Sequence, residues 1–382
     1  MTQEKDYWLM MRSCFATAFA VTVCAGPLSS QASPVPYAIA QPPLQERAAI
    51  DSARAILLDG MRRSGIPGAA VTVVRDGRVV WSEGFGLADA ENRVPATTLT
   101  RFRIGSVSKP LATAALGILI EEGRLDLDAP VQRYVPSFPA KRYPFTVRQL
   151  AGHLAGIRHY GNDEEFLSMK HYGSVSDALS IFRNDSLQFR PGEQFGYSTF
   201  GYVLLSAVIE SAAGEPFVSF VRRRVIDPIG MRHTVAEYPD SIIPYRARFY
   251  SRKDSLSAIH NAPFVDNSNK WAGGGYLSTT EDLALFGQSM STAGLLKRGT
   301  MDVLWTSMRT ADGKPTNYGV GWSVNTDSSG RRMISHSGGS VGGTALLFIF
   351  PEERLVFAFL FNSDQRQPQL RRAMSFFLRK PA

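Results

Sequence analysis

Segments with strand-forming composition lie at both ends of this 382-residue chain, and segments with helical patterns lie between them. Near the N-terminus, residues 69–74 and 78–81 flank Asp76-Gly77, a pair that suits a two-residue hairpin turn with positive φ. Four more runs of β-branched or aromatic residues occur late in the chain, at 318–324, 332–336, 344–350 and 355–361. This order predicts an α/β fold: an antiparallel sheet built from both termini and flanked by helices, with a mainly helical lobe inserted.

The helices are expected from apolar periodicity and from turn residues at their ends. They are predicted at residues 45–63, 146–154, 202–213, 281–289 and 369–378. The segment Ser278-Thr279-Thr280-Glu281 fits a capping box for the fourth of these helices. We expect one domain over residues 45–380, with its sheet part at about 45–105 and 318–380 and its helical lobe at about 111–317.

The first 32 residues have the features of a cleavable secretory signal. Arg12 precedes an apolar run at residues 14–25, and Ser30-Gln31-Ala32 is a cleavage site of small residues. A second such site is Ala38-Ile39-Ala40, and translation from Met1 or from Met11 fits the pattern. A proline-rich linker is expected at 33–44, and no later segment reaches the ~20 apolar residues that span a bilayer. The expected location is therefore periplasmic or secreted.

Both cysteines, Cys14 and Cys24, lie in this leader. A mature chain that starts near Ser33 would have none, which excludes disulfides, thiolate metal sites and a cysteine nucleophile. Lipid anchoring at Cys24 is the less favoured alternative. The formal net charge of +8 is spread without blocks of like charge, so no nucleic-acid partner is expected. No metalloprotease, phosphate-loop or dinucleotide motif occurs, and His153, His159 and His171 do not form a metal set, so neither cofactor nor metal is predicted.

The segment Ser106-Val107-Ser108-Lys109 is the first candidate for catalysis. If it opens a helix, residues three apart face the same side, and Lys109 can reach the Ser106 hydroxyl. A lysine that burial makes neutral can accept the serine proton, leaving an alkoxide to attack a carbonyl. The alternative is an ordinary N-cap serine with an exposed lysine, which these four residues alone favour.

Two further motifs follow in order. Tyr197-Ser198-Thr199 precedes a predicted helix, and His336-Ser337-Gly338-Gly339 ends a predicted strand. Ser-x-x-Lys, then a tyrosine motif, then Lys or His with Ser or Thr and Gly is the pattern of penicillin-recognising serine hydrolases. Over residues 50–378 the chain therefore resembles the superfamily of class C β-lactamases and D-alanyl-D-alanine peptidases. Residues 192–202, 266–275 and 336–339 resemble the mitochondrial serine β-lactamase-like family and its bacterial relatives.

The resemblance assigns catalytic roles to matching residues. Ser106 would be the nucleophile and Lys109 its base, while the phenol of Tyr197, kept acidic by adjacent cations, would move protons to and from the leaving group and water. The backbone N–H groups of Ser106 and Gly339 would form the oxyanion hole. The Gly273-Gly274-Gly275 loop would border the cleft, as in relatives.

The resemblance also implies that Thr199, His336, Ser337 and Gly338 bind substrate. Two of these depart from the pattern of the lactamases, which have Asn in place of Thr199 and Lys in place of His336. A histidine with an ordinary pKa near ~6.5 is mostly neutral at pH 7 and gains charge as the pH falls. The chain therefore lacks the fixed cation that would bind a β-lactam carboxylate, and hydrolysis of β-lactam antibiotics is a less favoured function.

Residues 338–342 also match G-x-S-x-G, the nucleophile elbow of another hydrolase fold. That elbow requires a helix after Ser340, whereas residues 344–350 are expected to form a strand, so Ser340 is not the predicted nucleophile. The sequence thus predicts a serine hydrolase that acts on peptide or amide bonds in a small-molecule or peptide substrate. The alternatives are a carboxylesterase, a weak β-lactamase, and a catalytically silent binder of cell-wall peptides. Self-association is expected from the filaments of the mitochondrial family.

Overall fold

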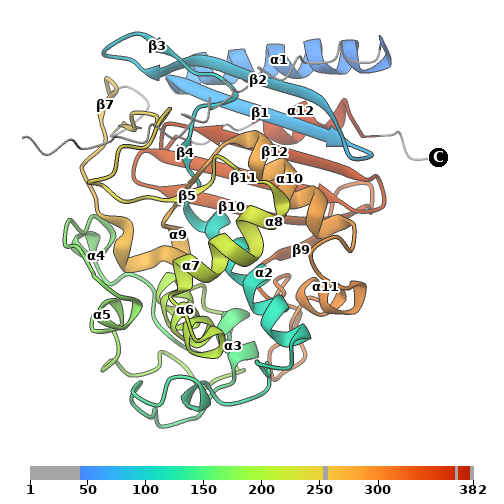
Figure 1. Cartoon of the computed structure of the whole chain (residues 1–382). Coiled ribbons are helices and arrows are strands. Elements are labelled where there is room, and N and C mark those ends of the chain that lie inside the picture. The colour runs from blue at the N-terminus through green and yellow to red at the C-terminus, as the bar shows by residue number, and fades with distance from the viewer. Residues whose placement is uncertain (1–43, 253–256, 366–368, 379–382) are drawn as a thin grey trace, which may run out of the picture. The chain divides into compact units, whose positions relative to one another are not determined.

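The computed structural model describes residues 44–252, 257–365 and 369–378 (Figure 1). The predicted signal, both cysteines and nearly all of the proline-rich linker lie outside these residues. The strands are β1 (Gly68–Arg75), β2 (Arg78–Asp89), β3 (Val94–Pro95), β4 (Phe102–Arg103), β5 (Val235–Ala236), β6 (Tyr250–Ser251), β7 (His260–Asn261), β8 (Tyr276–Ser278), β9 (Ser323–Thr326), β10 (Arg332–Ser340), β11 (Gly343–Phe350) and β12 (Leu355–Phe361).

The helices lie mostly between β4 and β9 in the chain, as the sequence predicts. They are α1 (Leu44–Ser64), α2 (Ser108–Glu121), α3 (Val147–Ala151), α4 (Asp163–Phe166), α5 (Val175–Leu179), α6 (Thr199–Ala213), α7 (Phe217–Val221), α8 (Asp227–Ile229), α9 (Trp271–Gly274), α10 (Thr280–Ser291), α11 (Arg298–Leu304) and α12 (Leu370–Ser375). Short turns of other helical types are η1 (Gly105–Val107), η2 (Val131–Arg133), η3 (Arg222–Ile226) and η4 (Asn267–Lys270).

The main sheet has seven antiparallel strands in the order β3-β2-β1-β12-β11-β10-β9. Strand β1, from the beginning of the domain, pairs with β12, from its end, with Ala69 opposite Phe361. The predicted antiparallel sheet built from both termini is therefore confirmed. At the β1–β2 turn, Asp76 has φ 51° and Gly77 has φ 77°, as a two-residue hairpin with positive φ requires.

The two faces of this sheet bury different helices. Because side chains alternate along a strand, Val71 and Val73 of β1 pack with Phe357 and Phe359 of β12 in a core that includes α1 and α12. The other face contributes to a larger core with α2, α6 and α10, and Figure 1 shows α1 on one side of the sheet and α2 and α10 on the other. Each such buried side chain stabilises the fold by about 1.5–3 kcal/mol.

Three expected elements differ clearly from the structure. The helix expected at 146–154 is only α3, which ends at Ala151, because His153 has left-handed backbone with φ 61°. The strand expected at 318–324 is only β9, because residues before it turn tightly against α2: Gly321 has φ 81°, and a Cβ there would lie 2.4 Å from the Thr113 side chain. The predicted capping box is also shifted by one residue. Thr279, not Ser278, caps α10 by accepting from the N–H of Asp282 at 3.2 Å, because Ser278 belongs to β8.

Within the described ranges, no individual helix combines the length and apolar character needed to cross a membrane. Helix α6 and the following segment Phe217–Ile229, which bend by 74° relative to each other, meet those criteria as a pair.

Candidate active site

The Ser-x-x-Lys segment forms a tight turn that runs into helix α2. Gly105 opens it with φ +47°, a conformation that glycine adopts without strain. Ser106 lies in the turn η1, and Lys109 is in the first turn of α2. The Nζ of Lys109 is 2.9 Å from the Oγ of Ser106. The prediction that this segment opens a helix and brings the two side chains together is confirmed.

Lys109 is fully buried, with an exposed fraction of 0%. Its Nζ donates a second hydrogen bond to the backbone carbonyl of Gly273, at 2.9 Å, and lies 4.8 Å from the centre of the Tyr197 ring. No ion pair found among the described residues includes it. Burial, helped by the charge of Lys270, holds the pKa of Lys109 well below its ordinary value. The side chain is therefore suited to be a neutral amine that accepts a proton from Ser106.

Strand β10 passes so close to this turn that two glycines are required. A Cβ on Gly338 would lie 2.0 Å from the carbonyl oxygen of Ile104 and 3.0 Å from the backbone nitrogen of Ser106. A Cβ on Gly105 would lie 2.5 Å from the carbonyl oxygen of Gly339. Gly339 itself is exposed, with open space where a side chain would be. The two backbones that are predicted to form the oxyanion hole are thus neighbours.

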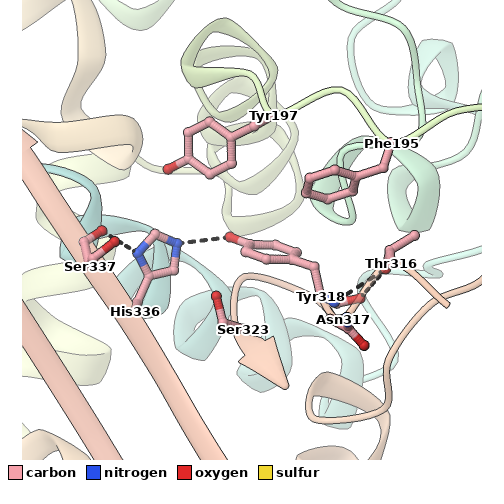
Figure 2. Close-up of a pocket in the computed structure, with 8 residues that line it drawn as sticks. All are labelled: Phe195, Tyr197, Thr316, Asn317, Tyr318, Ser323, His336 and Ser337. Atoms are coloured by element: carbon pink, nitrogen blue, oxygen red, sulfur yellow. Dashed lines mark hydrogen bonds between the residues drawn. The ribbon is translucent and has the colours of Figure 1, made fainter. Parts of the chain in front are cut away.

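A pocket of about 310 Å³ has Tyr197, which is hydrogen bonded to Ser106, in its wall, and Figure 2 shows the side chains around it. Ser106, Lys109 and Gly339 are not among its lining residues. Three predicted site residues line it: Tyr197, His336 and Ser337. Five lining residues were not predicted from the sequence: Phe195, Thr316, Asn317, Tyr318 and Ser323. The segment that brings Tyr318 to the pocket is the tight turn that was expected to be a strand, so the sequence pattern contained no indication of its role.

His336 is held by hydrogen bonds at both ring nitrogens (Figure 2). Its Nδ1 lies 2.7 Å from the carbonyl oxygen of Ser337, which can only accept, so this nitrogen carries the proton. The Oη of Tyr318 then donates to Nε2, at 2.9 Å. Burial lowers the pKa of His336 to about 3. The expectation that His336 gains charge near pH 6.5 is therefore wrong, because its surroundings stabilise the neutral ring.

The phenol of Tyr197 is also neutral. Burial raises the pKa of Tyr197, and a hydrogen bond with Ser106 offsets only part of that effect. The expectation that neighbouring cations keep this phenol acidic is wrong. The adjacent Lys109 is buried, and its lowered pKa favours the neutral amine over a cation. A protonated phenol in contact with Ser106 can give a proton rather than take one.

Thr199 lies next to the pocket without lining it. It is buried, with 4% exposed, as the first residue of α6. Its N–H donates to Nδ1 of His159 at 3.2 Å, and its hydroxyl is hydrogen bonded to Tyr160. A Cβ on Gly273 would lie 2.6 Å from its methyl group. Thr199 thus packs α6 against the glycine segment, and this geometry gives no support to its predicted contact with substrate.

His153 supports the pocket from behind, which the sequence did not suggest. It has φ 61°, and its Nδ1 accepts from the N–H of Ser198 at 3.1 Å. Its ring centre lies 4.3 Å from that of Tyr197 and 4.9 Å from that of Tyr318. The sequence could have indicated only its backbone conformation, because a residue just after a short helix often has positive φ. Across the described part of the chain, no group of three His, Cys, Asp or Glu side chains could hold a metal ion.

Comparisons with known proteins agree with this geometry. A sequence model of the family described as Beta-lactamase matches residues 53–375. The human mitochondrial serine beta-lactamase-like protein LACTB is 36% identical over 399 residues, covering 80% of this chain and 72% of that protein.

Two solved structures are also similar. The octameric penicillin-binding protein homologue from Pyrococcus abyssi has a TM-score of 0.74 at 25% identity, covering 85% of this chain and 76% of its own. A D-stereospecific amidohydrolase from Streptomyces sp. has a TM-score of 0.72 at 25% identity, covering 86% of this chain and 98% of its own. The extent of the family match and the identity to LACTB show that this chain belongs to the beta-lactamase family of serine hydrolases.

Proposed function

We propose that this chain hydrolyses peptide or amide bonds through an acyl-enzyme formed on Ser106. The observation that carries the proposal is the buried amine of Lys109, 2.9 Å from the serine oxygen and lacking a charged partner among the described residues. A lysine at its ordinary pKa would be protonated and unable to act as a base. Burial removes that obstacle.

The reaction would proceed in two halves. In the first, Lys109 takes the Ser106 proton as Oγ attacks the carbonyl carbon, and the N–H groups of Ser106 and Gly339 stabilise the oxyanion. The neutral phenol of Tyr197 protonates the leaving nitrogen as the carbon–nitrogen bond breaks. In the second, water attacks the ester and gives its proton to the Tyr197 phenolate that the first half leaves, and Lys109 returns its proton to Oγ of Ser106 as the carbon–oxygen bond breaks and the carboxylic acid leaves.

A peptide-like substrate is favoured by the exposed part of β10. Strand β9 pairs with β10 from Arg332 to Ser335, whereas β11 pairs with it as far as Ser340. On the side of β9, no described strand therefore pairs with the segment from Ser337 to Ser340, where Ser337 and Gly339 are exposed. An extended peptide can add to such an edge through main-chain hydrogen bonds. An ester has no N–H group at the bond to be cleaved and so makes fewer of these main-chain hydrogen bonds.

Hydrolysis of β-lactams is disfavoured by His336. A neutral imidazole engaged by Tyr318 and the Ser337 carbonyl offers no fixed cation to the carboxylate of such substrates. A carboxylesterase is the second candidate, because the same serine machinery cleaves esters with better leaving groups. The similarity to the D-stereospecific amidohydrolase supports an amide substrate over an ester.

The test uses a fluorophosphonate probe and intact-mass measurement on wild type, Ser106→Ala and Ser340→Ala. One adduct is expected in wild type and in Ser340→Ala, and none in Ser106→Ala. Turnover of a D- or L-aminoacyl anilide is then compared with that of the matching ester. Absence of any adduct would identify a silent binder, an adduct on Ser340 would refute the site, and an enzyme that cleaves the ester alone would be an esterase.

We also propose that the chain is exported, since Arg12 to Ala32 has the pattern of a cleavable signal. N-terminal sequencing of the protein isolated from its host is expected to begin near Ser33 or Gln41. A cytoplasmic protein that retains Cys14 and Cys24 would refute export.

A further inference from the structure

A second pocket, of about 260 Å³, shares no lining residue with the first. Its walls come from α7, the turn η3, strand β5 and the loop 238–244 that follows β5, and β8 contributes Tyr276. Its volume equals that of roughly nine liquid waters at ≈ 30 Å³ each, enough for a small organic molecule. Apolar side chains make much of the wall, among them Val218, Ile226, Ile243 and Pro244.

The charged side chains that line this second pocket are both arginines, Arg101 and Arg222, with no Asp or Glu among its lining residues. Arg222 is mostly exposed, and its contact with the carboxylate of Asp227 is long, at 3.8 Å. Arg101 is in no ion pair found among the described residues, and its Nη2 lies 3.3 Å from Nδ1 of His233. The pocket therefore presents positive charge.

The carboxylate of Asp282 is near enough to interact electrostatically with Arg101, but it already accepts hydrogen bonds from two other groups. Its Oδ2 accepts from the hydroxyl of Thr234 at 2.8 Å and from the N–H of His233 at 2.7 Å. Asp282 is buried and does not line the pocket. It offsets part of the Arg101 charge without occupying the guanidinium face.

Two buried polar atoms around this pocket have no hydrogen-bond partner among the described residues: Nε of Arg101 and Oη of Tyr276. Tyr276 is 1% exposed. Buried donors of this kind are rare because an unmade hydrogen bond destabilises the fold. Each of these groups could donate to an acceptor atom of a ligand that lies against it.

We propose that this pocket binds a small anionic amphiphile: a carboxylate or phosphate group joined to a short alkyl or aryl group. The anionic head lies at Arg101 and Arg222, where charge-assisted hydrogen bonds form. The apolar tail packs on Val218, Ile226 and Ile243. This division of a pocket into an apolar wall and a few convergent polar groups is that of small-molecule sites in general.

The test measures binding of octanoate and octyl phosphate by calorimetry, with octanol and octylammonium as uncharged and cationic comparisons. The Ser106→Ala protein is used, so that the proposed acyl-enzyme chemistry does not contribute. Both anions are expected to bind at least tenfold more tightly than octanol, and octylammonium is expected not to bind. A preference between the two anions distinguishes a carboxylic acid from a phosphate monoester as the ligand.

Three variants locate the site. Arg101→Gln and Arg222→Ala should each weaken anion binding roughly tenfold or more, and Val218→Trp should abolish it by filling the pocket. Arg223→Ala is the matched control, because Arg223 neighbours Arg222, pairs with Glu215 and does not line the pocket. Should Arg101→Gln fail to fold, Arg222→Ala and Val218→Trp still decide the matter.

The proposal is overturned if neither anion binds at millimolar concentration, or if octanol binds as tightly as octanoate. It is also overturned if Arg222→Ala and Val218→Trp leave anion binding unchanged, because the anion then binds elsewhere.

Discussion

Replacing Lys109 with methionine tests whether the amine that faces Ser106 is neutral in the folded protein. Methionine keeps much of the apolar length of lysine and removes its amine. In the fold, burial holds the pKa of Lys109 well below its ordinary value, whereas in the unfolded chain the pKa returns to about 10.4. Between these two values the unfolded state binds one proton more than the folded state, so the stability of wild type must rise with pH.

The expected size follows from linkage. One proton contributes about 1.4 kcal/mol for each pH unit inside this window. At pH 8, deprotonating the lysine costs about 3 kcal/mol, and at pH 9.5 it costs about 1 kcal/mol. Against this, the variant loses two hydrogen bonds, to Ser106 and Gly273, worth about 2 kcal/mol together. Lys109→Met should therefore be more stable than wild type at pH 8 by about 1 kcal/mol and less stable at pH 9.5 by a similar amount.

The free energy of unfolding is measured by urea titration at pH 8 and pH 9.5, followed by tryptophan fluorescence. Ser106→Ala is the control, because it removes the neighbouring hydroxyl but keeps the lysine, and it should follow wild type. Lys270, whose pKa burial lowers to about 8, titrates in all three proteins and cancels in their differences. If wild type and Lys109→Met show the same change between the two pH values, the lysine is charged in the fold, and the reasoning that makes it a base is wrong.

Four further outcomes follow from the site. Because the pKa of His336 is lowered to about 3, the ratio of kcat/KM for an anionic and a matched neutral substrate should stay constant from pH 5.5 to 7.5; a rise of that ratio on acidification would mean that the imidazole gains a proton there. The same shift means that below pH 6.5 the unfolded chain binds a proton at His336 that the folded protein does not bind. The free energy of unfolding should therefore fall by about 2 kcal/mol between pH 7.5 and pH 5, in addition to any fall in a His336→Asn variant. Equal losses in the two proteins would contradict the lowered pKa. Gly338→Ala should unfold or inactivate the protein, since its Cβ would lie 2.0 Å from the carbonyl oxygen of Ile104, whereas Gly339→Ala, which meets no atom within 4 Å, should keep the thermal midpoint of wild type; similar midpoints for the two variants would show that β10 is not packed against the serine turn. Tyr197→Phe should lower kcat by about 10²- to 10⁴-fold with little change in KM, as for loss of a proton donor; a wild-type kcat would remove the phenol from the mechanism.

Local patterns predicted most of the sheet. The pair Asp76-Gly77 dictates a turn with positive φ, and the run at 355–361 coincides with β12, since both depend on neighbours in the chain. The spacing of Ser106 and Lys109 likewise sets their contact, because one helical turn joins them. The three motifs occur in the order typical of penicillin-recognising serine hydrolases, and this order predicted that the segments of Ser106, Tyr197 and His336 lie close together.

The states of the site residues could not be predicted, because they depend on burial by distant segments. The removal of water around His336 makes that imidazole neutral, and nothing in the sequence near residue 336 indicates this burial. The same holds for Tyr197, whose pKa is raised by packing. Thr199 fits the motif by position, yet the close approach of Gly273 turns it into a packing residue.

The pairing of β1 with β12 makes completion of the main sheet depend on the last strand of the domain. Asn362 accepts a hydrogen bond from the N–H of Gly68, 294 positions earlier, and β12 lies in the sheet between β1 and β11. A growing chain in which Ser106 and Lys109 have already left the ribosome still has β1 with an unpaired edge. The sheet closes only after Phe361 emerges, and contacts so distant in sequence form slowly. A chain that lacks β12 thus leaves β1 with an open edge, which chaperones or proteases can bind, even when Ser106 and β10 are both present.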